Sequence, residues 1–298
     1  MFLDRKRELC LLSSGIPHLD HILGSSHGLP MGSVMLMYED TFTKYAKHMS
    51  RYFLSQGRLD GHDVCIMSSK NNQEIQEKII EKCPKAVEDN PQQQKVAETA
   101  EKMNIAWRYN PQPQIRTKSN GGAFTTAENG VNLFPNGASD VFTIHNIHEL
   151  EDLVGSRYTA TTGNHKNPLR VLIEYDNKDE SFNSNELQES LLHLRELARG
   201  SFVVIMIIFP AWLYGESTMA EHLVDAAVAI DSFSSDYYLA TDKSLREYQG
   251  FVRVKKPLRL HSLTGIEVGT EQSGTTKYGF KCLKRDVNIE KIHFIPDA

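Results

Sequence analysis

A predicted strand leads directly into a predicted helix near the amino terminus, and the turn between them contains no glycine. Residues 32–38 form an apolar run typical of a buried strand, and apolar residues at helical spacing follow over 43–56. Strand–turn–helix units that bind phosphate carry G-x-x-x-x-G-K-[ST] at this junction, because glycine lets several backbone N–H groups converge on phosphate oxygens. Here the turn reads EDTFT, residues 39–43. The sequence therefore predicts the frame of a phosphate-binding unit with a degenerate phosphate loop.

Only the lysine of the phosphate-loop motif is present. When Lys44 is aligned with it, Tyr38 and Thr43 stand at the two glycine positions, and Tyr45 stands where a hydroxyl would bind magnesium. The acidic residues at 39 and 40 would face a polyphosphate, and like charges about 4 Å apart repel by roughly 4 kcal/mol near a protein surface. We expect Lys44 to be a solvated lysine in the first turn of a helix. A divergent ATPase that uses Lys44 remains the alternative.

The rest of the chain predicts an α/β fold with a mostly parallel central sheet flanked by helices. The run FVVIMIIF at 202–209 is the most hydrophobic, which places it at the sheet centre, buried on both faces. Shorter runs in the last third alternate apolar and polar residues, which favours antiparallel strands at the C-terminal edge of the sheet. The other expected parallel strands are 63–68, 170–176 and 226–230, with helices at 144–154, 185–199 and 216–224. The expected edge strands are 237–240, 250–254, 278–283 and 289–294.

The 40% hydrophobic content is enough for a large core, and length alone allows one large domain or two small ones. We expect a single domain over residues 1–298. Residues 111–140 are rich in Pro, Gly, Asn, Ser and Thr, and predict a long loop or partly disordered insertion. The four cysteines form no C-x-x-C pair, the first residues contain no apolar signal segment, and no apolar run approaches the ~20 residues of a membrane span. We expect a cytoplasmic protein, with the nucleus as a second compartment to consider.

Charge is distributed unevenly along the chain. Residues 243–293 hold eleven Lys and Arg against five Asp and Glu, whereas residues 1–242 hold 22 against 32. A basic region on an acidic body could attract an anionic partner such as RNA. The alternative is a set of edge strands with solvated lysines on one face.

No catalytic, metal or cofactor site emerges from the motifs. Glu174 and Asp176 lie at the end of the predicted strand 170–176, and either could be the carboxylate that, in phosphate-loop ATPases, ends the strand beside the loop and helps to position magnesium. Because Tyr45 replaces the partner hydroxyl, we expect Glu174 mainly to mark the end of a strand at the water boundary. The twelve histidines lie in no metal-binding motif, and no serine lies in a G-x-S-x-G turn.

Several segments resemble one protein family. They are SGIPHLDHILG at 14–24, GLPMGSVMLMYED at 28–40, RYFLSQG at 51–57, GHDV at 61–64, MNIAWRY at 103–109 and YGFKCLKRDVNIEKIHFIPD at 278–297. Together they resemble the PAXNEB family, which supplies the fourth subunit of the Elongator complex. The opening segment alone would indicate only the wider RecA-like group. The matching segments extend from one end of the chain to the other.

This resemblance implies a noncatalytic RecA-like subunit that forms a heterohexameric ring with Elongator subunits 5 and 6. The implied partners are also the catalytic subunits 1, 2 and 3, and tRNA, whose wobble uridine the complex modifies to 5-carboxymethyl-type products. In that setting the basic region and the insertion would contact the tRNA backbone. The candidate contacts are Arg116, Lys118, Lys255, Lys256 and Arg259. A RecA-like scaffold without an RNA role is a further alternative.

Overall fold

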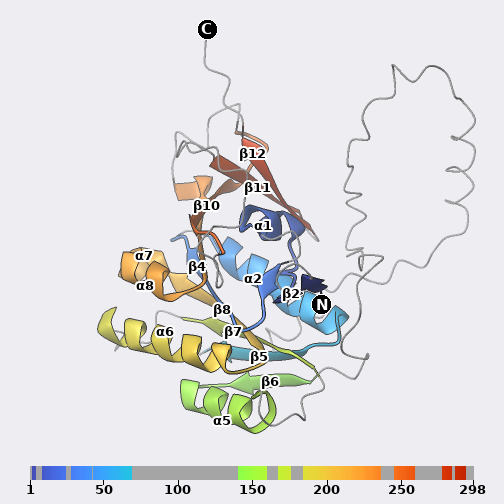
Figure 1. Cartoon of the computed structure of the whole chain (residues 1–298). Coiled ribbons are helices and arrows are strands. Elements are labelled where there is room, and N and C mark those ends of the chain that lie inside the picture. The colour runs from blue at the N-terminus through green and yellow to red at the C-terminus, as the bar shows by residue number, and fades with distance from the viewer. Residues whose placement is uncertain are drawn as a thin grey trace, which may run out of the picture. The chain divides into compact units, whose positions relative to one another are not determined.

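The computed structural model describes residues 2–4, 9–24, 28–41, 43–68, 140–159, 167–175, 184–235, 245–258, 277–283 and 286–292. They build a nine-stranded sheet with helices on both faces and a small three-stranded sheet (Figure 1). The insertion predicted at 111–140 falls outside these ranges except for its last residue, so that expectation stays a prediction.

The large sheet has the order β12-β11-β10-β9-β4-β8-β7-β5-β6. The strands from β9 to β6 in this order are parallel, and β10, β11 and β12 continue from β9 as antiparallel neighbours. A mostly parallel sheet with an antiparallel C-terminal edge is confirmed. The strands are β4 (Val34–Glu39), β5 (Asp63–Ser68), β6 (Val141–Ile144), β7 (Leu169–Glu174), β8 (Val203–Pro210), β9 (Ala226–Ser232), β10 (Gly250–Lys256), β11 (Lys277–Leu283) and β12 (Asp286–Ile292).

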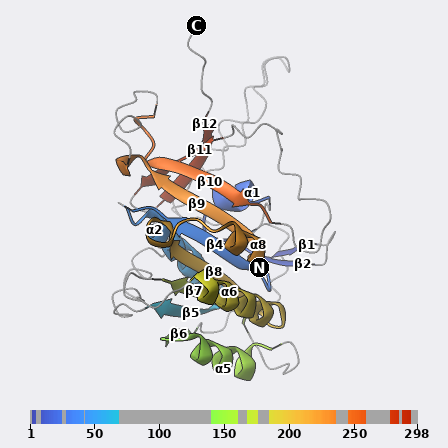
Figure 2. The same cartoon turned by 90° about the vertical axis from the view of Figure 1, so that its left-hand side faces the viewer.

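Helices cover the two faces of this sheet as two separate layers (Figure 2). On one face, α1 and α2 pack on alternate strand residues such as Met35, Met37 and Met206. On the other face, α5, α6 and α8 pack on the intervening residues such as Val34, Leu36 and Ile205. The helices are α1 (Pro17–Ile22), α2 (Tyr45–Leu59), α5 (Ile147–Arg157), α6 (Ser184–Arg199), α7 (Ala211–Tyr214) and α8 (Thr218–Leu223). The small sheet consists of β1 (Phe2–Asp4), β2 (Leu9–Leu12) and β3 (Leu29–Pro30).

The strongly apolar β8 lies beside β4 near the middle of the sheet, and every one of its residues is buried. Strand β6 is not expected from the sequence, because a four-residue edge strand gives little periodic signal. The last residue of β6, Ile144, is the residue at which we expect the helix 144–154 to begin. Helix α5 begins instead after its N-cap Asn146, whose side chain accepts a hydrogen bond from Glu149 N. The expected strand at 237–240 lies outside the described residues.

Helix α2 continues past residue 56, where the helical spacing of the sequence ends, and includes a glycine. Gly57 lies inside α2, which ends at Leu59 with Asp60 as its C-cap. A Cβ at Gly57 would lie 2.6 Å from Arg170 Cδ and 3.3 Å from Val64 Cγ2. The glycine is therefore present for the close approach of α2 to the sheet, not to terminate the helix.

Candidate functional site

The turn between β4 and α2 lies at the carboxyl edge of the parallel strands, where a phosphate loop would lie. Its two acidic residues have partners within the chain. Glu39, the last residue of β4, is buried, and its Oε2 lies 3.3 Å from Lys47 Nζ of α2. Asp40 Oδ2 accepts a hydrogen bond from Ser232 N, at the end of β9. Carboxylates and their internal partners therefore fill the edge at which phosphate oxygens would bind.

A second ion pair joins α2 to the end of β7. Arg51 Nη2 lies 2.7 Å from Glu174 Oε1, and the exposed fractions of the two side chains are 9% and 3%. The contact lies off the N–H direction, so it is an ion pair and not a hydrogen bond. Strand β8 lies between β4 and β7, so Glu174 ends the second strand from β4, and its part in a nucleotide site stays a prediction. The intervening strand is invisible in the sequence because pairing order depends on tertiary packing.

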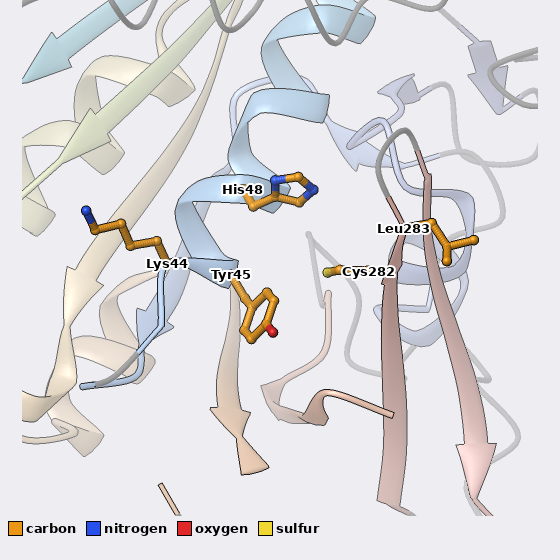
Figure 3. A pocket seen from close by; sticks show the side chains of 5 residues that line it. All are labelled: Lys44, Tyr45, His48, Cys282 and Leu283. Atoms are coloured by element: carbon orange, nitrogen blue, oxygen red, sulfur yellow. The ribbon is translucent and has the colours of Figure 1, made fainter. Parts of the chain in front are cut away.

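Lys44 and Glu174, the two predicted nucleotide-site residues, do not meet among the interactions of the described residues. Lys44 is the exposed N-cap residue of α2, as expected of a solvated lysine. With Tyr45 and His48 of α2, and Cys282 and Leu283 of β11, it lines an open pocket of about 340 Å³. Figure 3 shows the Lys44 side chain leaving the helix away from His48. Among the described residues, Lys44 therefore makes no ion pair with a carboxylate, and its part in a nucleotide site stays a prediction.

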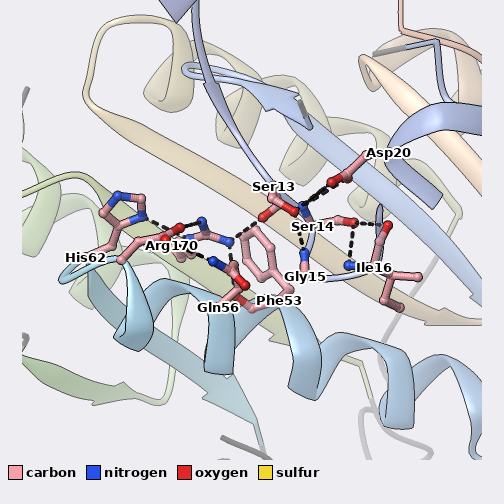
Figure 4. Close-up of polar contacts among 10 residues, drawn as sticks. Ser13, Ser14, Gly15, Ile16, Asp20, Phe53, Gln56, His62 and Arg170 are labelled. Atoms are coloured by element: carbon pink, nitrogen blue, oxygen red, sulfur yellow. Dashed lines mark hydrogen bonds and ion pairs between the residues drawn. The ribbon is translucent and has the colours of Figure 1, made fainter. Parts of the chain in front are cut away.

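A buried cluster around Arg170 of β7 fixes the opposite end of α2 (Figure 4). Arg170 is fully buried, and its guanidinium uses all three nitrogens. Nη1 donates to Ser13 O at 2.6 Å and Phe53 O at 3.1 Å, and Nη2 donates to Asp60 Oδ2 at 3.1 Å. Nε donates to His62 Nδ1 at 3.1 Å. The cluster thereby holds α2, β7 and the segment before α1 together.

The segment before α1 is the SGIP motif, and its structure explains its residue types. Gly15 has φ 85°, and a Cβ there would lie 2.3 Å from Tyr52 O of α2, so only glycine fits. Asp20 of α1 reaches back to accept hydrogen bonds from Ser14 N at 2.9 Å and Ser13 Oγ at 2.7 Å. The motif is therefore a docking element for α2, and it lies away from the turn between β4 and α2.

Two groups around this cluster have displaced pKa values. Burial, and then the positive charge of Arg170, lower the pKa of His62 to about 2, so the ring is neutral and its Nδ1 can accept from Arg170. Burial raises the pKa of Asp20 to about 6, against the opposing effect of its hydrogen bonds from Ser14 and Ser13. Both shifts arise from desolvation in a structural cluster.

Two of the five predicted tRNA contacts fall within the described residues, and both have internal partners. Lys255 Nζ lies 2.5 Å from Glu216 Oε2. Lys256 Nζ donates to His222 O at 2.9 Å and Val224 O at 2.5 Å. Their neighbour Arg253 also pairs with Glu216, at 2.7 Å. Arg116, Lys118 and Arg259 lie outside the described residues, so all five contacts stay predictions.

Within the described ranges, no group of three or more His, Cys, Asp or Glu residues is placed to hold a metal ion. Over the same ranges, no helix combines the length and the apolar character that a membrane span requires.

From the sequence we did not single out Lys47, Arg51 or Arg170. The first two make the ion pairs with Glu39 and Glu174, and Arg170 is the centre of the buried cluster. A signal exists for the first two, because they are four residues apart and share one face of α2. For Arg170 the sequence signal is a single charged residue at the start of an apolar strand.

Comparison with known proteins identifies the family. The family model described as PAXNEB protein matches residues 8–132 and 167–298. The chain belongs to the PAXNEB family. The interval between the two matched ranges contains β6 and α5. These two elements therefore lie outside the part of the chain that the family model matches.

Three vertebrate relatives match nearly the whole chain, and each is named Elongator complex protein 4. The zebrafish (Danio rerio) protein is 25% identical, with 96% of this chain and 82% of the relative covered. The mouse (Mus musculus) and human (Homo sapiens) proteins are each 26% identical, with 96% of this chain and 77% of the relative covered. The resemblance to this PAXNEB family is thus confirmed.

A solved structure confirms the fold class. A KaiC-like protein from the hyperthermophilic archaeon Pyrococcus horikoshii superposes with a TM-score of 0.51 at 14% identity, covering 95% of this chain and 99% of that chain. At this identity the likeness concerns the fold alone. The PAXNEB chain therefore has a RecA-type core, in which the phosphate loop is replaced by EDTFT.

Proposed function

We propose that this chain is a noncatalytic RecA-like subunit of the Elongator complex. In this proposal it forms a heterohexameric ring with subunits 5 and 6, binds tRNA there, and supports wobble-uridine modification by the catalytic subunits 1, 2 and 3. The observation that carries the assignment to Elongator is the family match over residues 8–132 and 167–298, together with relatives named Elongator complex protein 4.

The noncatalytic part of the proposal rests on the carboxyl edge of the sheet. A RecA-type nucleotide site needs backbone N–H groups free to bind phosphate, and a carboxylate free to bind magnesium. Here the edge carries Glu39 paired with Lys47, and Glu174 paired with Arg51. Both carboxylates would have to lose a partner before a nucleotide and its cation could bind.

Exposed apolar side chains at the same edge support a role in assembly. Trp212, Leu213 and Tyr214 of α7 are 40%, 43% and 37% exposed, and Met219 of α8 is 52% exposed. Helix α7 follows β8 directly, and Tyr38 of β4 is hydrogen-bonded to Ser217 between α7 and α8. Large apolar residues gathered on one surface usually mark a protein interface. A ring subunit would bury these side chains against a neighbour.

The experiment is co-expression of the tagged chain with Elongator subunits 5 and 6, followed by affinity purification. We expect both sister subunits to co-purify in a stable assembly. Trp212→Ala combined with Met219→Ala should weaken their recovery, whereas Leu192→Ala should not, because Leu192 is similarly exposed at 46% but lies on α6. Absence of both sister subunits from the purified wild-type chain would contradict the assignment to Elongator.

The tRNA part of the proposal is tested by the salt dependence of binding. Phosphate contacts supply affinity without reading sequence, and removing one of them reduces the slope of log K against log salt by about 0.7–0.9. Charge reversal at Arg116, Lys118 or Arg259 in the assembled ring should weaken tRNA binding and flatten this slope. Lys255→Glu should have a smaller effect, because Lys255 is paired with Glu216. Unchanged slopes would exclude these residues as tRNA contacts. A ring that does not bind tRNA would favour the alternative of a RecA-like scaffold without an RNA role.

The active-ATPase alternative retains one specific observation, the exposed Lys44 at the N-cap of α2. Titration of the chain with ATP and magnesium, followed by calorimetry, separates the two functions. We expect no saturable binding to the isolated chain. Tight binding that disappears in Lys44→Ala would favour the ATPase.

A further inference from the structure

Two ion pairs join the helix that follows β4 to the ends of two strands. Lys47 and Arg51 are one turn apart on α2, so they share a face of the helix. Lys47 reaches Glu39 at the end of β4, and Arg51 reaches Glu174 at the end of β7. Glu39 is in register with Pro210 of β8, and Glu174 is in register with Ile208. The two carboxylates therefore lie at one edge of the sheet, two strand spacings (about 10 Å) apart across the strands and two residues (about 7 Å) apart along them.

Both pairs are largely removed from water. The exposed side-chain fractions are 14% and 7% for Lys47 and Glu39, and 9% and 3% for Arg51 and Glu174. A buried charge that loses its partner is strongly destabilising, because nothing replaces the lost solvation. Arg51 Nη1 is also buried, without a hydrogen-bond partner among the residues that the structure describes. The Arg51 guanidinium therefore has unused capacity to bind an oxygen anion.

The chemistry of these pairs parallels that of a bound nucleotide with its metal. In a phosphate-loop protein, a phosphate anion faces cations at the start of the helix, and a divalent cation faces a strand-end carboxylate. In this chain the Glu39 carboxylate takes the place of the phosphate and faces Lys47. The Arg51 guanidinium takes the place of the divalent cation and faces Glu174. Each pair supplies from within the chain the charge that the nucleotide complex would contribute.

We propose that Lys47 and Arg51 form an oxyanion site that the chain's own carboxylates occupy, as a tethered substitute for nucleotide and metal. The native site is closed to a free ligand because the tethered carboxylates are always present at high effective concentration. It holds β4, α2 and β7 in one arrangement without exchange of ligand. Removal of a carboxylate should open it to a small polyanion of the inorganic diphosphate class. The inference goes beyond the proposed function, since it holds for the chain in or out of a complex.

The test is thermal unfolding of the full chain with and without inorganic pyrophosphate, in magnesium-free buffer adjusted to equal ionic strength with chloride. Wild-type Tm should not respond to pyrophosphate. Glu174→Gln, which keeps the side-chain size but removes the charge, should lower Tm by about 10 °C. Pyrophosphate well above its dissociation constant should then restore about 5 °C of that loss.

Two further variants serve as controls. The double variant Arg51→Met, Glu174→Leu replaces the pair by apolar groups, so it should recover most of the wild-type Tm without any pyrophosphate response. Glu216→Gln breaks the more exposed pairs with Arg253 and Lys255, and should show neither the large loss nor the rescue. If Glu174→Gln does not fold, Glu39→Gln provides the same measurement through Lys47.

The wild-type chain responding to pyrophosphate as strongly as the variant would overturn the proposal. So would a carboxylate variant that is destabilised but not rescued, or one that keeps the wild-type Tm. Because no other Elongator subunit takes part in the test, its failure leaves the assignment to the complex untouched. Failure of the co-purification experiment, in turn, would leave this inference standing.

Discussion

Helix α2 is tied to β7 by two buried arginines, which differ in how many polar partners their nitrogens have. At the end near the small sheet, Arg170 belongs to the strand and binds Asp60, His62, Ser13 and Phe53 through all three nitrogens. At the carboxyl edge, Arg51 belongs to the helix and faces one carboxylate, with one nitrogen left over in the described part of the chain. The complete network is a structural cluster, whereas the incomplete one lies where related folds bind a ligand.

The difference shows that one helix can be anchored to the sheet both by a complete buried network and by simpler ion pairs. The Arg170 cluster holds the end of α2 that a nucleotide never contacts, and it depends on Gly57 for the approach of the helix. The part of α2 at the carboxyl edge of the sheet makes two ion pairs, with Glu39 and Glu174. Changes at the two ends should therefore differ in size and in their response to anions and pH.

The largest effect is expected from Arg170→Met. The variant leaves Asp60 without its buried cation, and it also leaves the carbonyls of Ser13 and Phe53 without this donor. We expect a loss of about 5 kcal/mol in the free energy of unfolding, measured by urea denaturation. Arg170→Lys should lose less, because it keeps the charge but not the planar set of donors. A loss below about 1 kcal/mol for Arg170→Met would contradict the central role of this cluster.

Arg51→Met should have the second largest effect. The change leaves Glu174 buried at 3% exposure without its cation, so we expect a loss of about 3 kcal/mol in the free energy of unfolding. We expect this loss to be smaller than that of Arg170→Met, because Arg51 contacts fewer polar groups. Equal losses in matched urea titrations would show that the two ends of α2 are held equally.

The Arg170 end should also produce an acid-dependent loss of stability. The pKa of His62 is lowered to about 2. Below pH 6.5 this histidine is therefore protonated in the unfolded chain but stays neutral in the folded chain. Stability from this group is complete above pH 6.5 and falls by roughly 1.4 kcal/mol per pH unit as the pH drops toward 2. Urea denaturation between pH 7 and 4.5 measures it, and His62→Gln should flatten the profile. An unchanged profile in His62→Gln would contradict the neutral, buried histidine.

Asp20 acts in the opposite direction over part of the same range and must be separated from His62. Its pKa is raised to about 6, so its contribution is complete below pH 3.8 and is lost as the pH rises through 6. Asp20→Asn removes this titration. The acid loss from His62 should therefore appear steeper in that background, provided that the wild-type profile is measured in the same buffers.

The smallest effect is expected from Lys44→Ala. Lys44 is exposed and is not part of either cluster, so the free energy of unfolding should change by less than about 0.5 kcal/mol. The same urea titration measures it beside Arg51→Met, seven residues along the chain. A loss comparable with that of Arg51→Met would mean that the surviving motif lysine, and not the ion pairs, organises this edge.

Much of the fold was predictable because long apolar runs report burial directly. The run that became β8 and the helix that became α6 follow from their patterns alone. Strand β6 and the interior position of Gly57 were not predictable, because the first is a short edge strand and the second depends on Arg170. In the candidate site, the sequence pointed to Lys44 and Glu174, whereas the structure joins Glu174 to Arg51.

The sequence by itself determined that this chain has a RecA-type frame without a phosphate loop, since hydrophobic periodicity and missing glycines are local properties. It also carried the segments that place the chain in the PAXNEB family. Only the tertiary structure decided which charges meet. Lys47, Arg51, Glu39 and Glu174 come from three elements, and strand order and helix docking bring them to one edge. Partners that are distant along the chain are chosen by packing, and no local pattern records that choice.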